Sequence, residues 1–335
     1  MARATKGQPR ESTRDDVARL AGVSTAVVSY VVNNGPRPVA PATRERVLEA
    51  IEKLGYRPNT VARSLITGRS GLIGLIVPDV ENPYFASLAR SVESAVTERG
   101  LRMVLAQSTS ETLGDLVDSM AGHLVDGIIT ATLPPADLLA RSALIRVPLV
   151  KVGVALPTDP IPALWPDFEQ GTRDAVRHLI EVHGHRAIAL VTGGDARESR
   201  EAGWREVMAE HGLATDAVVR IPWSAEGGHD AAFVLRDRFP HVTAAFVASD
   251  QQATGLLAGL HRIGWEVPGR LALASFDGSL GARFTIPPLT TAAVPLADMA
   301  RDAVEDLLGA EPENRSYSAT LVVRESCGCA PAEAD

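Results

Sequence analysis

The sequence predicts a small all-α helix-turn-helix head followed by an α/β body of two doubly wound parallel-sheet subdomains. Two amphipathic segments joined through Gly22 predict the helix-turn-helix, and a third helical segment ends at Gly55. From Leu72 onward, apolar runs typical of buried strands alternate with amphipathic stretches, as in a parallel sheet flanked by helices. The distribution of charge also changes between these two parts.

Formal charge separates a basic head from an acidic body. Residues 1–70 contain 12 Lys and Arg against 6 Asp and Glu, a net charge of +6, whereas the other 265 residues carry a net charge of −14. This asymmetry indicates a polyanion-binding module tethered to a part with a different partner. Charge alone leaves a solvated, arginine-rich tail as the alternative, but the helical pattern of the head disfavours it.

Length and composition predict two or three domains. The chain has 335 residues, of which 45% are hydrophobic and 22% charged, enough for a sizeable core. No apolar run reaches the roughly 20 residues needed to cross a bilayer, and no apolar stretch follows the charges of Met1 to Arg10. We therefore expect a cytoplasmic protein that does not insert into membranes.

The first helix of the head is predicted from Asp15 to Ala21, with Ser12 or Thr13 as its cap and Gly22 as its end. Its expected inward side chains are Val17, Leu20 and Ala21. The second helix is capped by Ser24 and runs to about Asn33. In it Val27, Val28 and Val31 face inward, while Thr25, Ala26, Ser29 and Tyr30 face outward.

The third helix is predicted to begin near Pro41 and to stop at Gly55. Its expected inward side chains are Val47, Leu48, Ile51 and Leu54. The segment from Asn59 to Leu65 follows Pro58 and is too short to hold a helix in isolation. We expect this segment to fold only when the head is bound to its partner.

Apolar runs in the body predict two series of parallel strands with a ligand cleft between them. The first series is Leu72 to Val77, Arg102 to Ala106, Gly127 to Thr130 and Leu149 to Val154. The second series is Ala187 to Thr192, Val218 to Pro222, Ala244 to Ser249 and Leu271 to Phe276.

Ligand-binding side chains are expected on the loops that follow the strands. Asp79, Tyr84 and Phe85 follow the first strand, where an aromatic pair could stack on a sugar or base ring and the carboxylate could accept hydroxyls. Helix capping and core packing are the alternatives for these three residues. Asp250 is a further carboxylate after a strand, and a capping role is open for it.

The sequence gives no sign of a metal site or a catalytic site. Cys327 and Cys329 are separated by a single residue, so we expect unpaired, reduced thiols. His178, His183 and His185 cluster near an expected turn, yet no matching ligands recur at metal-type spacing. No phosphate-binding glycine loop follows a predicted strand, and we expect no cofactor.

The head carries a series of short motifs: Asp16 to Ser24, Asn33-Asn34, Thr43 to Val47, Leu54 to Asn59 and Ala62 to Leu65, continued by Ile73 to Asp79. With these motifs the chain resembles the lactose-repressor (LacI/GalR) family over nearly its whole length. The resemblance implies a periplasmic-binding-protein-like body whose chain crosses between halves near Trp165, Thr291 and Ala319. It also implies that the second helix enters the major groove and that the segment after the third helix becomes a hinge helix on DNA.

When these motifs are matched to the family, its base-reading positions correspond to Thr25 and Ala26 in this sequence. A further contact position corresponds to Tyr30. Ala26 offers only apolar contact, as to a thymine methyl, while Thr25 can hydrogen-bond a base or a phosphate. Tyr30 could reach a phosphate through its hydroxyl, or could be a half-buried packing residue. Leu65 matches the hinge leucine that inserts into the minor groove, with a linker leucine packed on the body as its alternative. The expected DNA-binding residues are Ser24, Thr25, Ala26, Ser29, Tyr30, Asn33, Arg57, Asn59, Ala62, Arg63 and Leu65.

The resemblance also assigns effector residues. Asp277, directly after a predicted strand, matches the family's ligand-binding acid, and Arg200 matches its ligand-binding arginine. Asp167, Trp223 and Ser249 match further cleft positions. Family members often have Asn where Ser249 stands, which weakens the case for a hydroxyl-rich sugar effector.

These inferences predict a ligand-responsive, DNA-binding transcriptional regulator. We expect it to be a repressor that acts as a homodimer on a pseudo-palindromic operator. The alternatives are a sugar-binding protein of a transport system, which a secretory segment would support, and an enzyme on nucleosides or sugars, which would turn over its ligand. The expected divisions are a flexible basic arm (1–11), the helix-turn-helix domain (12–58), the hinge helix and linker (59–70), an effector-binding and dimerisation domain (71–330) and a tail (331–335).

Overall fold

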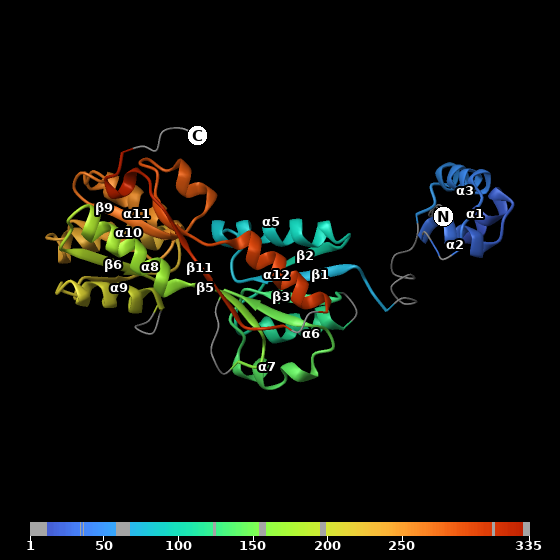
Figure 1. The fold of residues 1–335 in the computed structure, drawn as a ribbon, viewed down its shortest axis with the longest axis horizontal. Coiled ribbons are helices and arrows are strands. Elements are labelled where there is room, and N and C mark those ends of the chain that lie inside the picture. The colour runs from blue at the N-terminus through green and yellow to red at the C-terminus, as the bar shows by residue number, and fades with distance from the viewer. Residues whose placement is uncertain are drawn as a thin grey trace, which may run out of the picture. The chain divides into compact units, whose positions relative to one another are not determined.

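The computed structural model describes residues 12–33, 35, 37–57, 68–122, 125–153, 159–194, 199–309 and 312–330. The chain forms two units, Met1–Ser70 and Gly71–Asp335. Figure 1 shows a small helical first unit and a second unit in which helices cover two sheets. The predicted fold class, an all-α head and an α/β body with two parallel sheets, is thereby confirmed.

Three helices form the first unit: α1 (Arg14–Ala21), α2 (Thr25–Asn33) and α3 (Pro41–Leu54). Thr13 caps α1 in a capping box, in which its side chain accepts from the Asp16 amide and the Asp16 carboxylate accepts from the Thr13 amide. Gly22 and Gly55 end α1 and α3 with φ angles of 66° and 58°, a left-handed conformation that favours glycine.

The core of the first unit consists mainly of small apolar side chains. Its buried members are Val17, Ala18, Ala21, Val28, Val31, Val47 and Ala50. Three predicted inward side chains do not belong to this core: Leu20 is 52% exposed, Leu48 is 50% exposed, and Val27 is half-buried outside it. The inward stripes of α1 and α3 instead use Ala18 and Ala50, whose small side chains let the three short helices approach closely.

The first sheet of the second unit has the strand order β11-β5-β4-β3-β1-β2, with every pairing parallel. Its strands are β1 (Leu72–Val77), β2 (Arg102–Gln107), β3 (Gly127–Thr130), β4 (Leu149–Val152), β5 (Ala163–Asp167) and β11 (Arg315–Ser318). Its helices are α5 (Pro83–Glu98), α6 (Leu113–Ala121), α7 (Ala136–Ala140) and α12 (Leu296–Leu308), with a 3₁₀ turn at Ser142–Leu144. One apolar cluster joins α5 and α12 to one face, and another joins α6 and α7 to the opposite face.

The second sheet has the order β12-β10-β9-β8-β6-β7, and only the β10–β12 pairing is antiparallel. Its strands are β6 (Ile188–Thr192), β7 (Val218–Arg220), β8 (Ala244–Val247), β9 (Ala272–Asp277), β10 (Thr290–Ala293) and β12 (Thr320–Val322). Its helices are α8 (Phe168–Arg177), α9 (Ser199–Glu210), α10 (Ala225–Arg238) and α11 (Asp250–Arg262). Shorter helical segments are the π-helix η2 (His178–Val182) and the 3₁₀ helices η3 (Leu280–Phe284) and η4 (Glu325–Cys327).

The chain passes between the two sheets three times. It leaves the first sheet after β5, returns after β10, and passes once more between β11 and β12. Successive parallel strands place their carboxyl ends along the same edge of a sheet. The predicted ligand residues lie near these ends: Asp167 and Asp277 are the last residues of β5 and β9, and Tyr84 and Arg200 lie in the first turns of α5 and α9.

Candidate functional site

The start of α2 presents small polar side chains to solvent. The Val27 amide donates to Ser24 Oγ at 3.4 Å, which caps this helix. Val28 and Val31 are buried against α1 and α3, whereas Ala26 is exposed. Thr25, Ser29 and Tyr30 are half-buried on the same helix. The outward face predicted from the sequence is thus present, with a helix N-terminus whose amides favour phosphate.

Tyr30 packs partly on its own loop. Its carbonyl accepts a hydrogen bond from the Gly35 amide at 3.0 Å. A Cβ at Gly35 would lie 2.7 Å from Tyr30 Cδ1, so the ring lies directly against this glycine. The packing role is therefore real and fixes where the ring points, while the role of its hydroxyl on DNA stays a prediction.

The described surface of the first unit is rich in arginine. Arg57, predicted to contact phosphate, is exposed, as are Arg14, Arg19, Arg37, Arg44 and Arg46. Asn59, Ala62, Arg63 and Leu65, and the side chain of Asn33, lie outside the described residues. Their DNA contacts therefore remain predictions.

In the second unit, Asp277 ends β9 in an unusual backbone conformation. Its φ is 116°, the only positive φ at a non-glycine residue in the described part of the chain. Its side chain is buried, and Oδ2 accepts from the Asp250 amide at 3.3 Å. Burial and then the charge of Asp250 raise the pKa of the Asp277 carboxyl well above its ordinary value, against the opposing effect of Arg200. Strain and a perturbed carboxyl at the end of a strand indicate a functional position.

Arg200 in α9 lies among aromatic rings. Its Cζ is 4.0 Å from the ring centroid of Phe168, 4.8 Å from that of Phe276 and 5.5 Å from that of Trp223. Cation–π contacts of this kind stabilise a guanidinium that is partly removed from water. Trp223 is 41% exposed and lies against Gly193, where a Cβ would be 2.6 Å from the indole. This tryptophan can therefore offer a flat face to a ligand.

Tyr84 links this group to the helix that follows the first strand. It sits at the start of α5, where Asn82 caps the helix, and its ring meets Phe85 edge-on at 5.1 Å. Its hydroxyl is buried and has no hydrogen-bond partner in the described structure. Burial, then the charge of Asp277, raise the pKa of Tyr84, while Arg200 opposes the rise. Tyr84 from the first sheet thus interacts electrostatically with Asp277 and Arg200 from the second.

Other predicted residues are engaged in local structure. Asp79 accepts from the Glu81 amide at 2.9 Å, Asp167 caps α8 through the Gln170 amide at 2.9 Å, and Ser249 caps α11 through the Gln252 amide at 3.2 Å. Phe85 packs on the core of the first sheet. Asp167 directly precedes Phe168, whose ring lies against Arg200.

The capping role left open for Asp250 is wrong, because Ser249 is the N-cap of α11. Asp250 instead anchors the loop after β9. It accepts hydrogen bonds from Ser275 Oγ at 2.6 Å, Thr291 Oγ1 at 2.7 Å and the Ser279 amide at 2.6 Å. This network holds the backbone next to Asp277, so Asp250 positions the Asp277 side chain.

Two groups of residues were missed from the sequence. The first is Phe168, whose ring lies against Arg200. The only sequence feature that points to Phe168 is its position directly after Asp167, a predicted ligand residue. The expectation that His178 and His183 lack matching ligands is contradicted, because both histidines lie beside Cys327 and Cys329. These partners are about 150 positions away along the chain, where a search for local ligand spacing does not reach.

None of the described helices combines the length and apolarity needed to cross a membrane. Comparison with known proteins gives two family matches. Residues 13–59 match the model for bacterial regulatory proteins of the lacI family, and residues 176–327 match a periplasmic binding protein-like domain.

Full-length relatives include known regulators. The chain is 36% identical to catabolite control protein A of Priestia megaterium, over 85% of this chain and 88% of that protein. It is 35% identical to the HTH-type transcriptional regulator CelR of Thermobifida fusca, over 95% of this chain and 98% of that protein.

Solved structures agree with these relatives. The lac repressor dimer bound to operator and the anti-inducer ONPF superposes with a TM-score of 0.84 at 29% identity, covering 95% of this chain and 99% of that chain. The CelR–cellobiose complex superposes with a TM-score of 0.69 at 32% identity, covering 94% of this chain and 99% of that chain. These findings confirm the predicted resemblance and favour a regulator over a transport protein. The chain belongs to the LacI family of DNA-binding transcriptional regulators.

Proposed function

We propose that this regulator is a repressor that binds a pseudo-palindromic operator as a homodimer and that a small metabolite sets its affinity for that operator. One helix-turn-helix offers few base contacts, so two symmetric copies are needed to add their binding energies over paired half-sites. The related lac repressor was solved as a dimer on its operator, which supports this assembly. The proposal places the protein in the cytoplasm, with its DNA.

The observation that carries the metabolite site is the group formed by Tyr84, Arg200 and Asp277. The hydroxyl of Tyr84 is buried without a hydrogen-bond partner in the described structure, and it lies in the electrostatic field of a buried carboxyl and a guanidinium. A buried polar group left unsatisfied costs about 1–3 kcal/mol. A ligand hydroxyl at this position would remove that cost, so it would bind where the two sheets come together.

The chemistry of the group favours a sugar or a nucleoside-like ligand. Asp277 and Arg200 can bond ring hydroxyls, while the indole of Trp223 can stack on a sugar or base ring. Relatives agree with this class, since CelR was solved with cellobiose. The proposal assigns no reaction to these side chains: they bind and orient the ligand, and they leave it unchanged.

The proposed mechanism is a population shift. Tyr84 belongs to the first sheet, whereas Arg200 and Asp277 belong to the second. A ligand that bonds both sides favours one relative arrangement of the two sheets. That arrangement sets the separation of the two hinge segments, 59–70, in the dimer, and so determines whether they can fold on DNA.

A ligand screen followed by one substitution tests the site. Thermal shift with sugars and nucleosides identifies the ligand, and calorimetry then measures its Kd. Arg200→Gln removes a charge-assisted bond of about 1.5–3 kcal/mol and should weaken ligand binding roughly tenfold or more. Arg262→Gln is the matched control, because Arg262 is exposed in the last turn of α11. Equal Kd values for Arg200→Gln and the unmodified protein would contradict the proposed site.

A further inference from the structure

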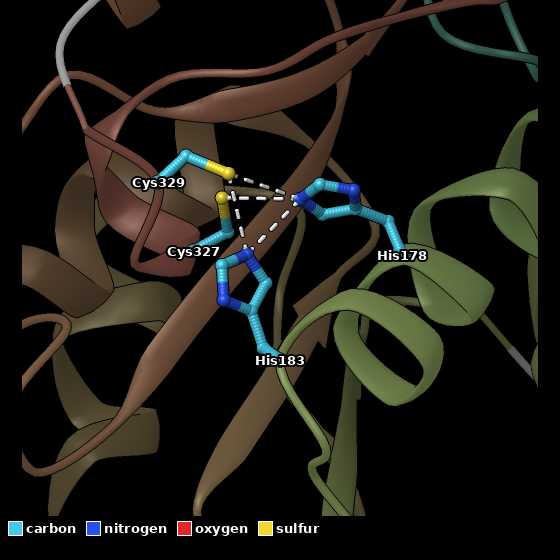
Figure 2. Close-up of side chains that lie close together, drawn as sticks. All are labelled: His178, His183, Cys327 and Cys329. Carbon is cyan, nitrogen blue, oxygen red and sulfur yellow. Dashed lines mark hydrogen bonds between the residues drawn. The ribbon is translucent and has the colours of Figure 1, made fainter.

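Four side chains from distant parts of the chain point toward one another in the second unit. His178 and His183 come from η2 and the residue that follows it, at the end of α8. Cys327 ends η4, and Cys329 lies two residues further on. Figure 2 shows the two imidazole rings and the two sulfur atoms converging from these two segments. All four potential ligand atoms lie within 4.8 Å of one another.

The spacing of these atoms matches a tetrahedral metal centre. The two Nε2 atoms are 3.2 Å apart, and Cys327 Sγ is 3.3 Å from His178 Nε2. Cys329 Sγ is 3.6 Å from His178 Nε2 and 3.3 Å from His183 Nε2. Zinc bonds of about 2.0–2.1 Å to nitrogen and about 2.3 Å to sulfur require tetrahedral edges of about 3.4 Å between nitrogens and about 3.6 Å between nitrogen and sulfur.

Local backbone geometry builds both halves of the cluster. Residues five apart diverge around an α-helix, but the wider π-helical turn from His178 to Val182 brings His178 and His183 to one side. Between the cysteines, Gly328 has φ of 107°, a conformation that favours glycine. A Cβ at Gly328 would lie 3.3 Å from His183 Nδ1, so this position also needs a small residue for contact with the ring.

We propose that His178, His183, Cys327 and Cys329 bind one Zn²⁺ ion in a structural site. Two imidazoles and two thiolates are a donor set that suits zinc, and oxygen-preferring ions such as Mg²⁺ and Ca²⁺ do not select it. Four protein ligands close the coordination sphere and leave no position for a substrate, which distinguishes this site from a catalytic zinc site.

Both cysteines are available as ligands. Neither forms a disulfide bond, and Cys327 is 1% exposed with its Sγ 3.3 Å from His178 Nε2. A zinc ion deprotonates a thiol that coordinates it, so the bound ion would itself hold both sulfur atoms as thiolates.

The metal would attach the end of the chain to the second sheet. η4 follows β12, the strand reached by the third passage between the sheets. Cys327 and Cys329 also pack on the apolar cluster that holds α8 and α9 against this sheet. Binding of the ion to these two segments should stabilise the folded second unit, because the unfolded chain does not preform the site.

Metal content of the full-length protein tests this inference. The protein is equilibrated with Zn²⁺, desalted and measured by elemental mass spectrometry. We expect one tightly bound zinc per chain, and we expect its loss in Cys329→Ser and in His183→Gln. His185→Gln is the matched control, because His185 lies two residues away but bonds Thr243 Oγ1 at 2.9 Å instead of the cluster. It should retain one zinc per chain.

A second measurement needs no substitution, so it holds even where a variant fails to fold. Co²⁺ replaces the Zn²⁺ in the unmodified protein, and a tetrahedral His₂Cys₂ site should give intense visible bands together with thiolate-to-cobalt charge transfer. Chelation of the zinc should also lower the thermal midpoint by roughly 5 °C or more. An octahedral cobalt spectrum, the absence of bound zinc, or zinc retained equally by Cys329→Ser and His183→Gln would overturn the proposal. In those cases the four side chains form only a hydrogen-bonded cluster.

Discussion

Backbone conformation and a hydrogen-bond network both constrain Asp277 in the proposed ligand site. Its φ of 116° strains a non-glycine backbone, and Asp250 holds the neighbouring loop through Ser275, Thr291 and Ser279. The next residue, Gly278, also has a positive φ, and a Cβ there would lie 2.4 Å from that of Ala293. Strain of about 1–3 kcal/mol persists only where the surroundings impose it. The surrounding fold therefore imposes this conformation on Asp277, as expected for the proposed ligand-binding acid.

The raised pKa of Asp277 predicts how stability depends on pH. Because the fold favours the neutral carboxyl, its contribution to stability is complete below the unfolded pKa of about 3.9 and is lost as pH rises through the folded value. Asp277→Asn cannot ionise, so its free energy of unfolding should rise relative to that of the unmodified protein as pH increases. Urea unfolding at a series of pH values measures this difference.

Asp237→Asn is the control for the pH experiment. Asp237 is exposed beside Arg236, whose hydrogen bond lowers the Asp237 pKa. This variant should show no gain in relative stability as pH increases. Parallel pH profiles for Asp277→Asn and the unmodified protein would show that Asp277 is ionised in the fold without cost, contrary to the account.

At the scale of elements, α10 and α11 pack closely through glycines. A Cβ at Gly255 would lie 1.8 Å from the Ala225 carbonyl oxygen, one at Gly228 would lie 2.0 Å from the Gln252 carbonyl oxygen, and one at Gly259 would lie 2.3 Å from the His229 carbonyl oxygen. The two backbones therefore touch where other residues would separate them. This contact holds both helices against the second sheet.

Gly255→Ala should force α10 and α11 apart and lower the free energy of unfolding by roughly 1–3 kcal/mol or more. Gly281→Ala is the matched control, since a Cβ at Gly281 meets nothing within 4 Å and its φ is not positive. This control should be neutral or slightly stabilising. Urea denaturation of both variants distinguishes the two cases, and equal midpoints would contradict the tight packing of these helices.

Strands and helices can be predicted from the sequence where a short stretch of residues carries the whole pattern. Buried parallel strands such as β1, β3 and β6 are continuous apolar runs, and this pattern predicts them to within one residue of their observed bounds. β5 contains Trp-Pro-Asp, and β11 and β12 are short and only partly buried, so their apolar signal is weak. For these strands the sequence offers only the family resemblance, which predicts that the chain crosses between the two halves of the body near them.

The residues of the candidate sites also fall into those that the sequence predicts and those that only the structure shows. Arg200 and Asp277 lie in short motifs that the resemblance could match. Phe168 near Arg200, and the cysteines near His178 and His183, depend on tertiary proximity between distant segments. The spacing of residues along the sequence does not predict contacts between distant segments, so only the folded structure shows them.

For the whole molecule, the separation of charge predicts how DNA binding responds to salt. The basic head should neutralise phosphates and release counterions, while the acidic body, at −14, should repel DNA elsewhere. For a dimer that makes about six to ten phosphate contacts, operator affinity should fall by roughly 10³-fold or more between 50 and 200 mM salt. Fluorescence anisotropy over this range measures the slope, and a flat response would exclude phosphate-dominated binding.

The hinge segment gives a second prediction at this scale. Leu65→Ala should weaken operator binding, because it removes the side chain expected to insert into the minor groove. The affinity for the small-molecule ligand should not change, since the proposed ligand site lies in the second unit. Anisotropy and calorimetry on one preparation measure both quantities. Unchanged operator affinity would refute the assignment of Leu65 to the hinge.

The most direct test of the account measures operator affinity with and without the ligand identified by thermal shift. Operator fragments are first selected from genomic DNA by the unmodified protein. We predict that the ligand changes operator affinity by about 5- to 150-fold, in one direction, for the unmodified protein, and that Arg200→Gln needs a roughly tenfold or more higher ligand concentration for the same change. Identical operator affinity with and without a bound ligand, or no sequence-selective retention of any fragment, would contradict the account.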